Sequence, residues 1–248
     1  MKKNLINIML AGILSTSLYG SDISFDMGMG LWSAKVTGTT GTRQYPSYDV
    51  ENYYGLKDRS ESGYAWLELK HDTLLPNYRF EMSSFFVDGK SEKATIYSGT
   101  LFAKGSTVEL ELDQYDNIFF YSLIDNEVLT IDLGLDIKTH DGYMSIERGS
   151  TKKKEKNDGT LVLYYTGVTL NPTSNITIQY NGKYGSKGSS KIKDEVIKAQ
   201  YMFLDQGAFS LGAEIGYKKE LKKIDSSDIS YTSDMNIKGA FIGIVGKF

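Results

Sequence analysis

Three features of the sequence predict an all-β protein, built as one antiparallel up-and-down barrel that crosses a membrane. Apolar and polar residues alternate along many segments, no run of 18 apolar residues follows the N-terminal segment, and short and long connections take turns between the segments. The chain has 248 residues, 25 glycines and 18 tyrosines. This length suits a single all-β domain, and tyrosines suit positions between an apolar and an aqueous phase.

The composition argues against several classes of function. The chain contains no cysteine, which excludes disulfides, thiolate metal sites, a cysteine nucleophile and a lipid-modified cysteine anchor. The formal net charge of −3 and the lack of a basic face give no support for a nucleic-acid partner. No phosphate-binding loop, dinucleotide fingerprint, calcium loop or zinc spacing occurs. We therefore expect no cofactor and no metal.

Residues 1–20, MKKNLINIMLAGILSTSLYG, have the three parts of a secretory signal peptide. Lys2 and Lys3 form a positive start, residues 5–14 are apolar, and small residues lead to the expected cleavage after Gly20. The apolar part is too short for a membrane-spanning helix. We expect an exported chain whose barrel occupies residues 21–248.

Strands are predicted wherever residues alternate with period two. In residues 127–138, EVLTIDLGLDIK, apolar side chains occupy the odd positions from 129 to 137, and threonine, aspartate or glycine occupies the even ones from 130 to 136. The same pattern occurs in residues 23–31, 65–70, 209–218 and 240–248. Such strands bury one face and hydrate the other.

The connections favour a membrane barrel over other all-β folds. Four are short, at residues 72–77, 125–126, 171–175 and 205–207, and five are longer and polar, at 38–62, 89–105, 140–158, 184–191 and 222–231. Long and short connections alternate strictly, so nine connections join ten strands and leave both termini on the periplasmic side. This asymmetry is typical of bacterial outer-membrane barrels. Counts of eight or twelve stay open, because residues 94–103 can form an additional hairpin arm.

A soluble β-sandwich or lipocalin-like barrel is the competing interpretation. Both have alternating strands, and period two alone does not separate an inward from an outward face. Neither predicts the regular asymmetry of loop length. Some stretches fit a membrane barrel poorly: residues 161–170 and 119–124 are apolar on both faces, and Phe241 and Val245 fall on the face expected to be wet.

Two stretches resemble an uncharacterised family of small proteobacterial outer-membrane β-barrel proteins. LKHDTLLPNYRFEM contains Leu75-Pro76-Asn77, which matches the family's Leu-Pro-Asn turn. The second stretch is ELDQYDNIFFYSLIDNEVLTIDLGLDIKTHDG. It matches the family's YY-x-x-L-D-N hairpin at Phe120-Tyr121, Leu123, Asp125 and Asn126, with Phe120 in place of the first tyrosine. Residues 132–135 match the D-L-G-L strand that follows this hairpin in the family. The resemblance is strongest over residues 63–142. It implies the barrel fold and an outer-membrane location, and it implies no activity.

Charged residues on the polar faces of the strands are the candidates for the barrel lumen. They are Glu68, Lys70, Asp132, Asp136, Glu214 and Lys218. Charges of both signs in so small a barrel predict an ion-paired and largely filled interior, because an aqueous channel needs a much larger barrel. A narrow small-solute channel remains the alternative.

His140 suggests a second alternative, a hydrolase at the extracellular rim. The histidine is adjacent to Asp141 and shares a strand face with Asp136, so a carboxylate can orient it as a general base. The competing interpretation takes THDG as a polar strand end that enters a turn. We favour a barrel without enzymatic activity.

Two loops stand out by composition. Residues 152–156, KKKEK, are expected to be a solvated loop, with lipopolysaccharide phosphates or an acidic partner as the alternative ligand. Tyr45, Tyr48, Tyr53 and Tyr54 are expected in an aromatic girdle or in a lid over the barrel mouth, and the other interpretation is a surface that binds sugar or protein.

The last strand alternates up to Phe248, with Ile244, Gly246 and Phe248 on the apolar side. Outer-membrane barrels resemble one another in this terminal aromatic, which implies recognition by the barrel-assembly machinery. We therefore expect a structural or surface-binding protein of the outer membrane. Its expected partners are membrane lipid, lipopolysaccharide and the assembly machinery, with no nucleic acid and no known protein partner.

Overall fold

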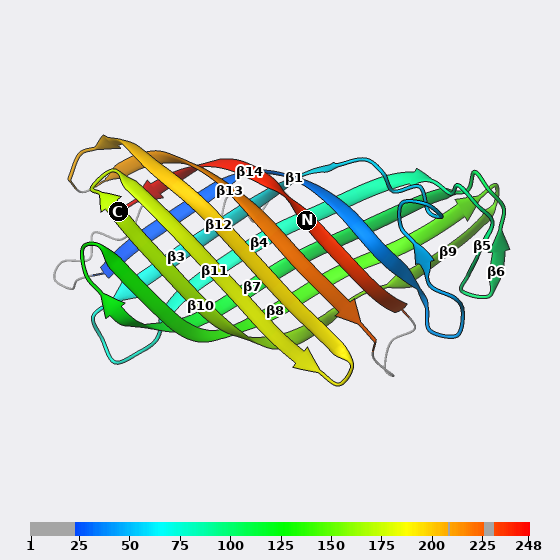
Figure 1. The fold of residues 1–248 in the computed structure, drawn as a ribbon, viewed down its shortest axis with the longest axis horizontal. Coiled ribbons are helices and arrows are strands. Elements are labelled where there is room, and N and C mark those ends of the chain that lie inside the picture. The colour runs from blue at the N-terminus through cyan, green and yellow to red at the C-terminus, as the bar shows by residue number, and fades with distance from the viewer. Residues whose placement is uncertain (1–22, 208, 226–230) are drawn as a thin grey trace.

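A computed structural model describes residues 23–207, 209–225 and 231–248. The expected signal peptide, residues 1–20, lies outside the described residues. Ten long strands form the barrel (Figure 1). They are β1 (Ile23–Thr42), β3 (Ser60–His71), β4 (Asn77–Lys90), β7 (Thr107–Asp125), β8 (Leu129–Arg148), β10 (Gly159–Thr173), β11 (Ile176–Lys187), β12 (Ser190–Asp205), β13 (Ser210–Ile224) and β14 (Tyr231–Lys247).

Each barrel strand pairs antiparallel with the next one along the chain, and the first pairs with the last. The β1–β14 pairing runs from Asp26↔Lys247 to Thr42↔Tyr231 and closes the barrel. Closure leaves no open sheet edge along the strands that it joins. The predicted all-β antiparallel barrel and its strand number are confirmed.

The connections divide the barrel into two ends. The short-turn end carries the β3–β4, β7–β8, β10–β11 and β12–β13 connections, and both β1 and β14 have their outer ends there. The opposite end, here called the long-loop end, carries the other five connections. One expectation about these is wrong: residues 184–191 are not a long loop, because β11 and β12 continue to Lys187↔Ser190 around a tight turn. Polar residues at this end lie on strands that extend past the apolar part of the barrel.

The same extension shortens a second predicted loop. β8 continues to Arg148, and β9 (Thr151–Lys156) pairs with its last six residues. Residues 152–156 are therefore part of a strand, and β9 is the last strand of the sheet on that side. Lysines on such a strand discourage edge-to-edge association.

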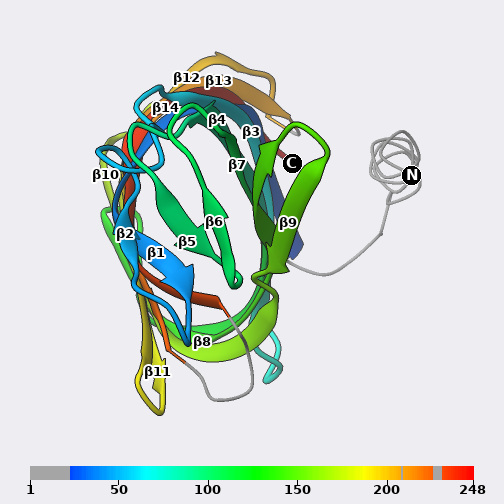
Figure 2. The ribbon, with the colours of Figure 1, turned by 90° about the vertical axis from the view of Figure 1, so that its right-hand side faces the viewer.

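The residues expected as an additional arm form a hairpin that leaves the strand count unchanged. β5 (Thr95–Tyr97) and β6 (Thr100–Phe102) make a separate two-stranded sheet around Ser98 and Gly99, which both have positive φ. Left-handed backbone at both central residues is the geometry of a tight hairpin turn. Figure 2 shows this hairpin inside the outline of the barrel strands at the long-loop end, close to β2 (Tyr48–Asp49).

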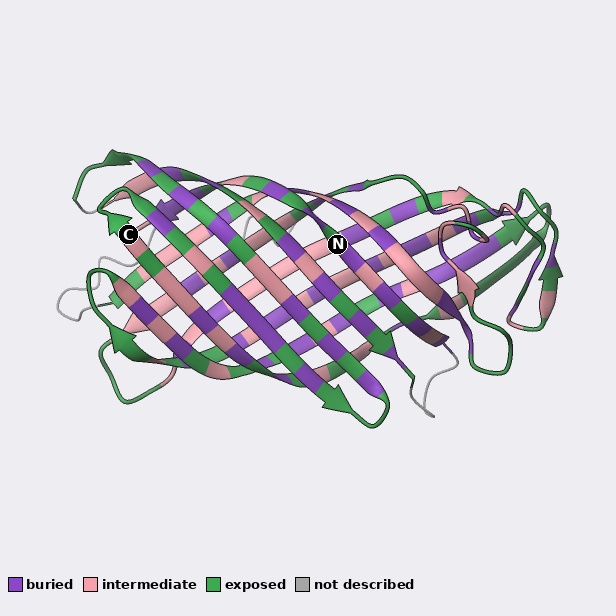
Figure 3. Ribbon diagram, viewed as in Figure 1, coloured by how far each residue is buried: buried purple, intermediate pink, exposed green. Residues whose placement is uncertain are grey.

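The polarity of the two strand faces reverses along the barrel axis. On β8, outward residues 133, 135 and 137 are exposed and apolar, whereas outward Asp141 and Glu147 are charged. The inward residues change in the opposite sense, from the charged Asp132 and Asp136 to the apolar Met144 and Ile146. Figure 3 shows buried residues alternating with more exposed ones along much of the barrel wall. We call the part with the apolar outer face, residues 129–138 of β8, the belt half, and the part beyond it the distal half.

Candidate functional site

The lumen of the belt half is occupied by a continuous chain of opposite charges. It begins on β3 with Glu68, which accepts a hydrogen bond from Arg79 Nη1 at 2.8 Å, and Arg79 Nε donates to Glu81 at 2.6 Å. Lys183 of β11 then reaches Glu81 at 2.5 Å and Asp116 of β7 at 2.8 Å. Because β4 and β11 are not neighbours in the sheet, the Lys183–Glu81 contact crosses the lumen.

The chain continues through the next lysines toward β13. Lys138 Nζ lies 3.0 Å from Asp116 Oδ1 and 3.1 Å from Asp194 Oδ2. Lys218 Nζ lies 3.4 Å from the same Asp194 oxygen. Lys138, Lys183 and Asp194 are almost completely buried. Charges this deep are tolerated only when they are paired and hydrogen-bonded, so the network fixes the strands around a filled interior.

The predicted lumen residues occupy this interior with different partners. Glu214 accepts hydrogen bonds from Tyr64, Trp66, Lys198 and Gln200 at 2.8–2.9 Å. Asp132 accepts one from Ser122 at 2.6 Å. The structure places Glu68, Asp132, Asp136, Glu214 and Lys218 among the buried residues, and Lys70 is half-buried with Nζ 3.5 Å from Glu68.

Several members of the charge chain were not predicted from the sequence. They are Arg79, Glu81, Asp116, Lys138, Lys183 and Asp194. A signal was present in the stretch YRFEM, where Arg79 and Glu81 alternate with Tyr78, Phe80 and Met82. A charge between apolar neighbours at period two marks an inward position in a barrel whose outer face is apolar.

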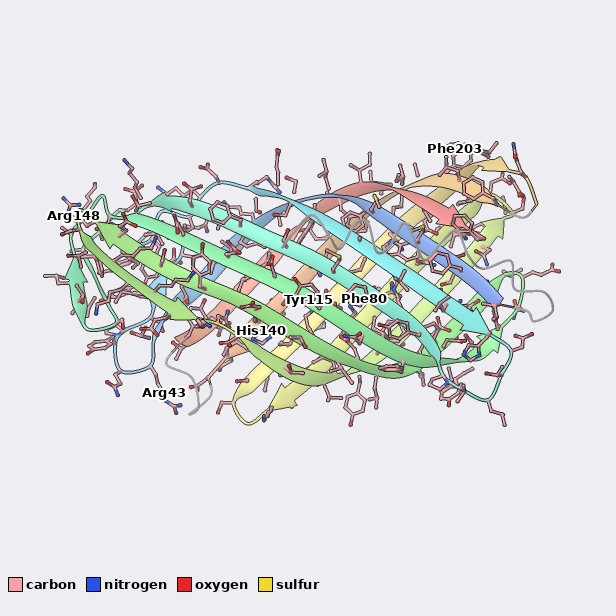
Figure 4. The ribbon with its side chains drawn as sticks, turned by 180° about the vertical axis from the view of Figure 1, so that it is seen from behind. Arg43, Phe80, Tyr115, His140, Arg148 and Phe203 are labelled. Carbon is pink, nitrogen blue, oxygen red and sulfur yellow. The ribbon has the colours of Figure 1, made fainter. Side chains whose placement is uncertain are left out.

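Asp136 and His140 are buried without the partners that a catalytic pair needs. Neither carboxylate oxygen of Asp136 has a hydrogen-bond partner among the described residues, and the same holds for His140 Nδ1. Asp141 is exposed, on the opposite face of β8 from His140. Figure 4 shows His140 between Arg148 at one end and Tyr115 near the middle of the barrel. The structure therefore does not bring His140, Asp136 and Asp141 together.

Apolar side chains form the main cluster in the lumen of the distal half, beside buried polar residues that include His140, Glu220 and Lys222. Its core includes Trp32, Val36, Tyr54, Phe85, Tyr97, Leu110, Met144, Tyr231 and Ile237. The β5–β6 hairpin contributes Tyr97, whose hydroxyl donates to the Met144 carbonyl oxygen at 3.1 Å, and burial raises the pKa of Tyr97. The Trp32 and Phe85 rings lie 6.3 Å apart. This core occupies the lumen beyond the charge chain.

A small cavity lies between the two fillings. It has about 50 Å³ of free space and is lined by Trp32, Trp66, Arg79, Lys198, Lys218 and Phe241, among others. Arg79 and Lys198 lie over the Trp66 ring at 4.5 and 3.9 Å from its centroid, as cation–π pairs. A space of this size holds a few water molecules.

The two loops singled out by composition belong to the distal half. Tyr54 is buried in the core, and the Tyr48 ring packs against Tyr53 and Tyr54 at 5.1 and 6.0 Å. On β9, Lys152 pairs with Glu147 and Glu109 at 3.1 and 3.7 Å. Tyr54 is therefore part of the distal core, and Tyr48 packs against that core.

The residues expected to signal assembly lie at the β1–β14 seam. Ile244 faces outward, Gly246 is buried, and Phe248 exchanges two backbone hydrogen bonds with Phe25 at 2.9 and 3.1 Å. The Phe248 ring also packs against Phe25 and Phe209, with centroids 5.9 and 5.0 Å apart. An aromatic cluster therefore covers the seam at the short-turn end.

Among the described residues, no group of three or more histidine, aspartate or glutamate side chains is placed to hold a metal ion. Within the same part of the chain, no helix has the length and apolar character needed to span a bilayer.

Solved structures with this architecture cover nearly the whole chain. The outer-membrane protease OmpT from Escherichia coli matches with a TM-score of 0.51 and 8% identity, over 94% of this chain and 99% of that chain. The chain has the fold of a bacterial outer-membrane β-barrel. The translocator domain of the autotransporter NalP from Neisseria meningitidis matches with a TM-score of 0.46 and 9% identity, over 98% of this chain and 94% of that chain. Ail from Yersinia pestis matches with a TM-score of 0.38 and 10% identity, over 91% of this chain and 99% of that chain. At such identities the likeness to OmpT concerns the fold alone.

Sequence comparisons give no further assignment. No protein-family model matches the chain, and no curated protein sequence matches it. The family resemblance carried by Leu75-Pro76-Asn77 and residues 120–135 therefore stays a prediction.

Proposed function

We propose that this chain resides in the bacterial outer membrane as a non-conducting barrel with a structural or surface-binding role. The fold and the apolar outer face of the belt half support this location, because strands in lipid need an apolar exterior and a closed ladder. The short-turn end then faces the periplasm, and the distal half projects from the cell. The expected signal peptide of residues 1–20 fits the same route.

One observation carries the proposal: two successive layers of side chains fill the lumen. The charge chain from Glu68 to Lys218 crosses the belt half, and the apolar core crosses the distal half above it. A conducting pore would require both layers to open. Its opening would leave buried charges unpaired and would expose the apolar core to water.

Planar-bilayer recording tests this proposal. Purified chain inserted into a planar bilayer should show no discrete conductance steps. Protection from protease in lipid vesicles that contain the same purified chain confirms that the barrel inserts. Steps that change in size with Asp132→Asn or Asp136→Asn would instead establish the narrow channel.

Hydrolysis at the extracellular rim is the weaker candidate function, because the surroundings of His140 do not suit a general base. A general base needs an orienting carboxylate and access to substrate, and His140 is only 2% exposed, with Asp141 on the other strand face. Any hydrolytic activity of the purified chain should therefore be unchanged in His140→Ala. A loss of activity in this variant, with a normally folded barrel, would establish the hydrolase.

The partners follow from the location. We propose contacts with membrane lipid, including lipopolysaccharide, and with the barrel-assembly machinery through Phe248 and its seam. The distal half offers the surface for any further partner.

A further inference from the structure

The outer wall formed by β8, β10, β11 and β12 contains an apolar groove. It has about 320 Å³ of free space, and its lining includes Leu133, Tyr164, Thr166, Tyr180, Gly182 and Tyr184. Gly182 lies at the base of the groove between its register partners Thr166 and Glu195. The Tyr180 ring lies over this glycine, because a Cβ at position 182 would lie 3.0 Å from the Tyr180 hydroxyl. Tyr164 is 73% exposed and forms a wall of the groove.

The end of the groove nearer the long-loop end has a polar rim. Lys193 is the register partner of Tyr184, and its Nζ lies 3.0 Å from Glu195 Oε1. The Tyr180 hydroxyl donates to the same glutamate oxygen at 3.1 Å. A lysine held in this way keeps N–H donors free for a further acceptor.

Additional lysines extend this rim over the outer faces of β12, β13 and β14. Lys191 is the register partner of Lys223, and Lys219 is the register partner of Lys238. None of these four lysines has a salt bridge among the described residues, where Glu195 and Asp234 are the acidic side chains interspersed with them. On their other sides Lys219 is opposite Glu195 and Lys223 is opposite Asp234, and these carboxylates offset part of the positive charge. Lys191 directly opposite Lys223 is still an unfavourable like-charge pair, which favours an anion between the two lysines.

We propose that this groove binds one acyl chain of a phosphorylated glycolipid of the outer leaflet, the lipid A part of lipopolysaccharide, and that Lys191, Lys193 and Lys223 bind its phosphate. The apolar groove complements the chain, and the lysines complement the charge. The site lies next to the β11–β12 turn at the long-loop end, which is the outer-leaflet side in the proposed orientation. The inference therefore rests on the outer-membrane location proposed above.

Native mass spectrometry of the full chain in detergent tests the site with purified lipid A as the probe. We expect a one-to-one adduct that weakens at least tenfold when lipid A is dephosphorylated or replaced by phosphatidylglycerol. The triple variant Lys191→Ala/Lys193→Ala/Lys223→Ala should weaken binding at least tenfold, and so should Gly182→Leu, whose side chain pushes the Tyr180 ring into the groove. Tyr164→Ala, which removes an exposed wall of the groove, should weaken it by a smaller factor and serves if Gly182→Leu does not fold.

Two matched variants control for unspecific effects. Gly63→Leu adds a side chain to an exposed outward position of β3 where nothing lies within 4 Å, and Lys153→Ala removes an exposed lysine of β9. Both should bind lipid A like the unmodified chain. Equal binding of phosphatidylglycerol, or unchanged binding in the lysine and groove variants, would overturn the inference. A barrel that inserts into bilayers without preferring lipid A refutes this site only, whereas a chain that does not insert refutes the proposed location.

Discussion

The belt half and the distal half are built from the same strands, but the polarity of the outward and inward side chains is reversed between them. On β7, outward Phe119 and Tyr121 are exposed in the belt half, and outward Glu109 and Glu111 replace them in the distal half. Inside, buried Asp116 in the belt half gives way to buried Leu110 in the distal half. One half has the apolar outer face that is typical of a membrane barrel, and the other has a charged outer face around an apolar core.

This comparison explains the stretches that fit a membrane barrel poorly. Phe241 belongs to the distal core, and Val245 packs with Trp66 and Met202 in a small cluster inside the belt half. Ile118, Phe120 and Tyr165 form another such cluster. A filled lumen accepts apolar side chains as well as ion pairs, so apolar residues on the inner face do not contradict a membrane barrel.

The largest expected effect comes from breaking the charge chain of the belt half. Lys183→Met leaves Glu81 and Asp116 without their nearest cation, and removing one partner of a buried ion pair costs about 3–5 kcal/mol. Urea unfolding in lipid vesicles, followed by electrophoretic mobility, should show this loss. Lys183→Arg, which keeps the charge, should lose less. A Lys183→Met barrel as stable as the unmodified one would mean that the ion pairs do not stabilise the lumen.

The distal core can be tested with two adjacent phenylalanines that face opposite sides. Phe85 is 1% exposed and packs in the core, whereas Phe86 is 45% exposed. Phe85→Ala should cost about 3–5 kcal/mol, and Phe86→Ala about 0.5 kcal/mol. Limited proteolysis should then cut the distal half of the Phe85→Ala barrel and spare its belt half. Equal losses for the two variants would contradict an apolar core inside the distal half.

The outer faces of the two halves can be compared on one strand. Leu133 and Asp141 both face outward on β8, in the belt half and the distal half respectively. Leu133→Arg should cost about 2–4 kcal/mol, because a cation on the lipid face near the bilayer midplane is unfavourable. Asp141→Arg should stay within about 0.5 kcal/mol. Unfolding of both variants in the same vesicles measures the difference, which should vanish if lipid does not surround Leu133.

The last comparison concerns the seam at the short-turn end, where a change should affect assembly more than stability. Deleting Phe248 removes two aromatic contacts worth about 0.5–1.5 kcal/mol each, together with the backbone bonds to Phe25. The yield of folded barrel in membranes should fall more than the stability does, because assembly is expected to require the terminal aromatic. Phe203→Ala, an exposed aromatic at the same end, is the control (Figure 4). Normal insertion of the deletion variant would contradict a role for Phe248 in assembly.

The fold could be predicted from the sequence because its evidence is local. Alternation and turn residues can be read within ten or so residues, and they sufficed for the strand order and for the short turns. The reach of the strands past the belt could not be read, because polar residues of a hydrated strand resemble those of a loop, as residues 184–187 show. Pairing across the lumen, such as Lys183 with Glu81, depends on strand tilt and side-chain reach, which alternation does not encode.

Site-directed spin labelling along β7 tests the reversal of polarity most directly, and the chain suits it because it has no cysteine of its own. Labels at Phe119→Cys and Tyr121→Cys should be accessible to oxygen dissolved in the bilayer, and labels at Glu109→Cys and Glu111→Cys to a water-soluble nickel chelate. Val108→Cys, at a completely buried position, should resist a soluble maleimide. The same accessibility at all four outward positions, or rapid modification at position 108, would contradict a barrel whose two faces exchange polarity between its halves.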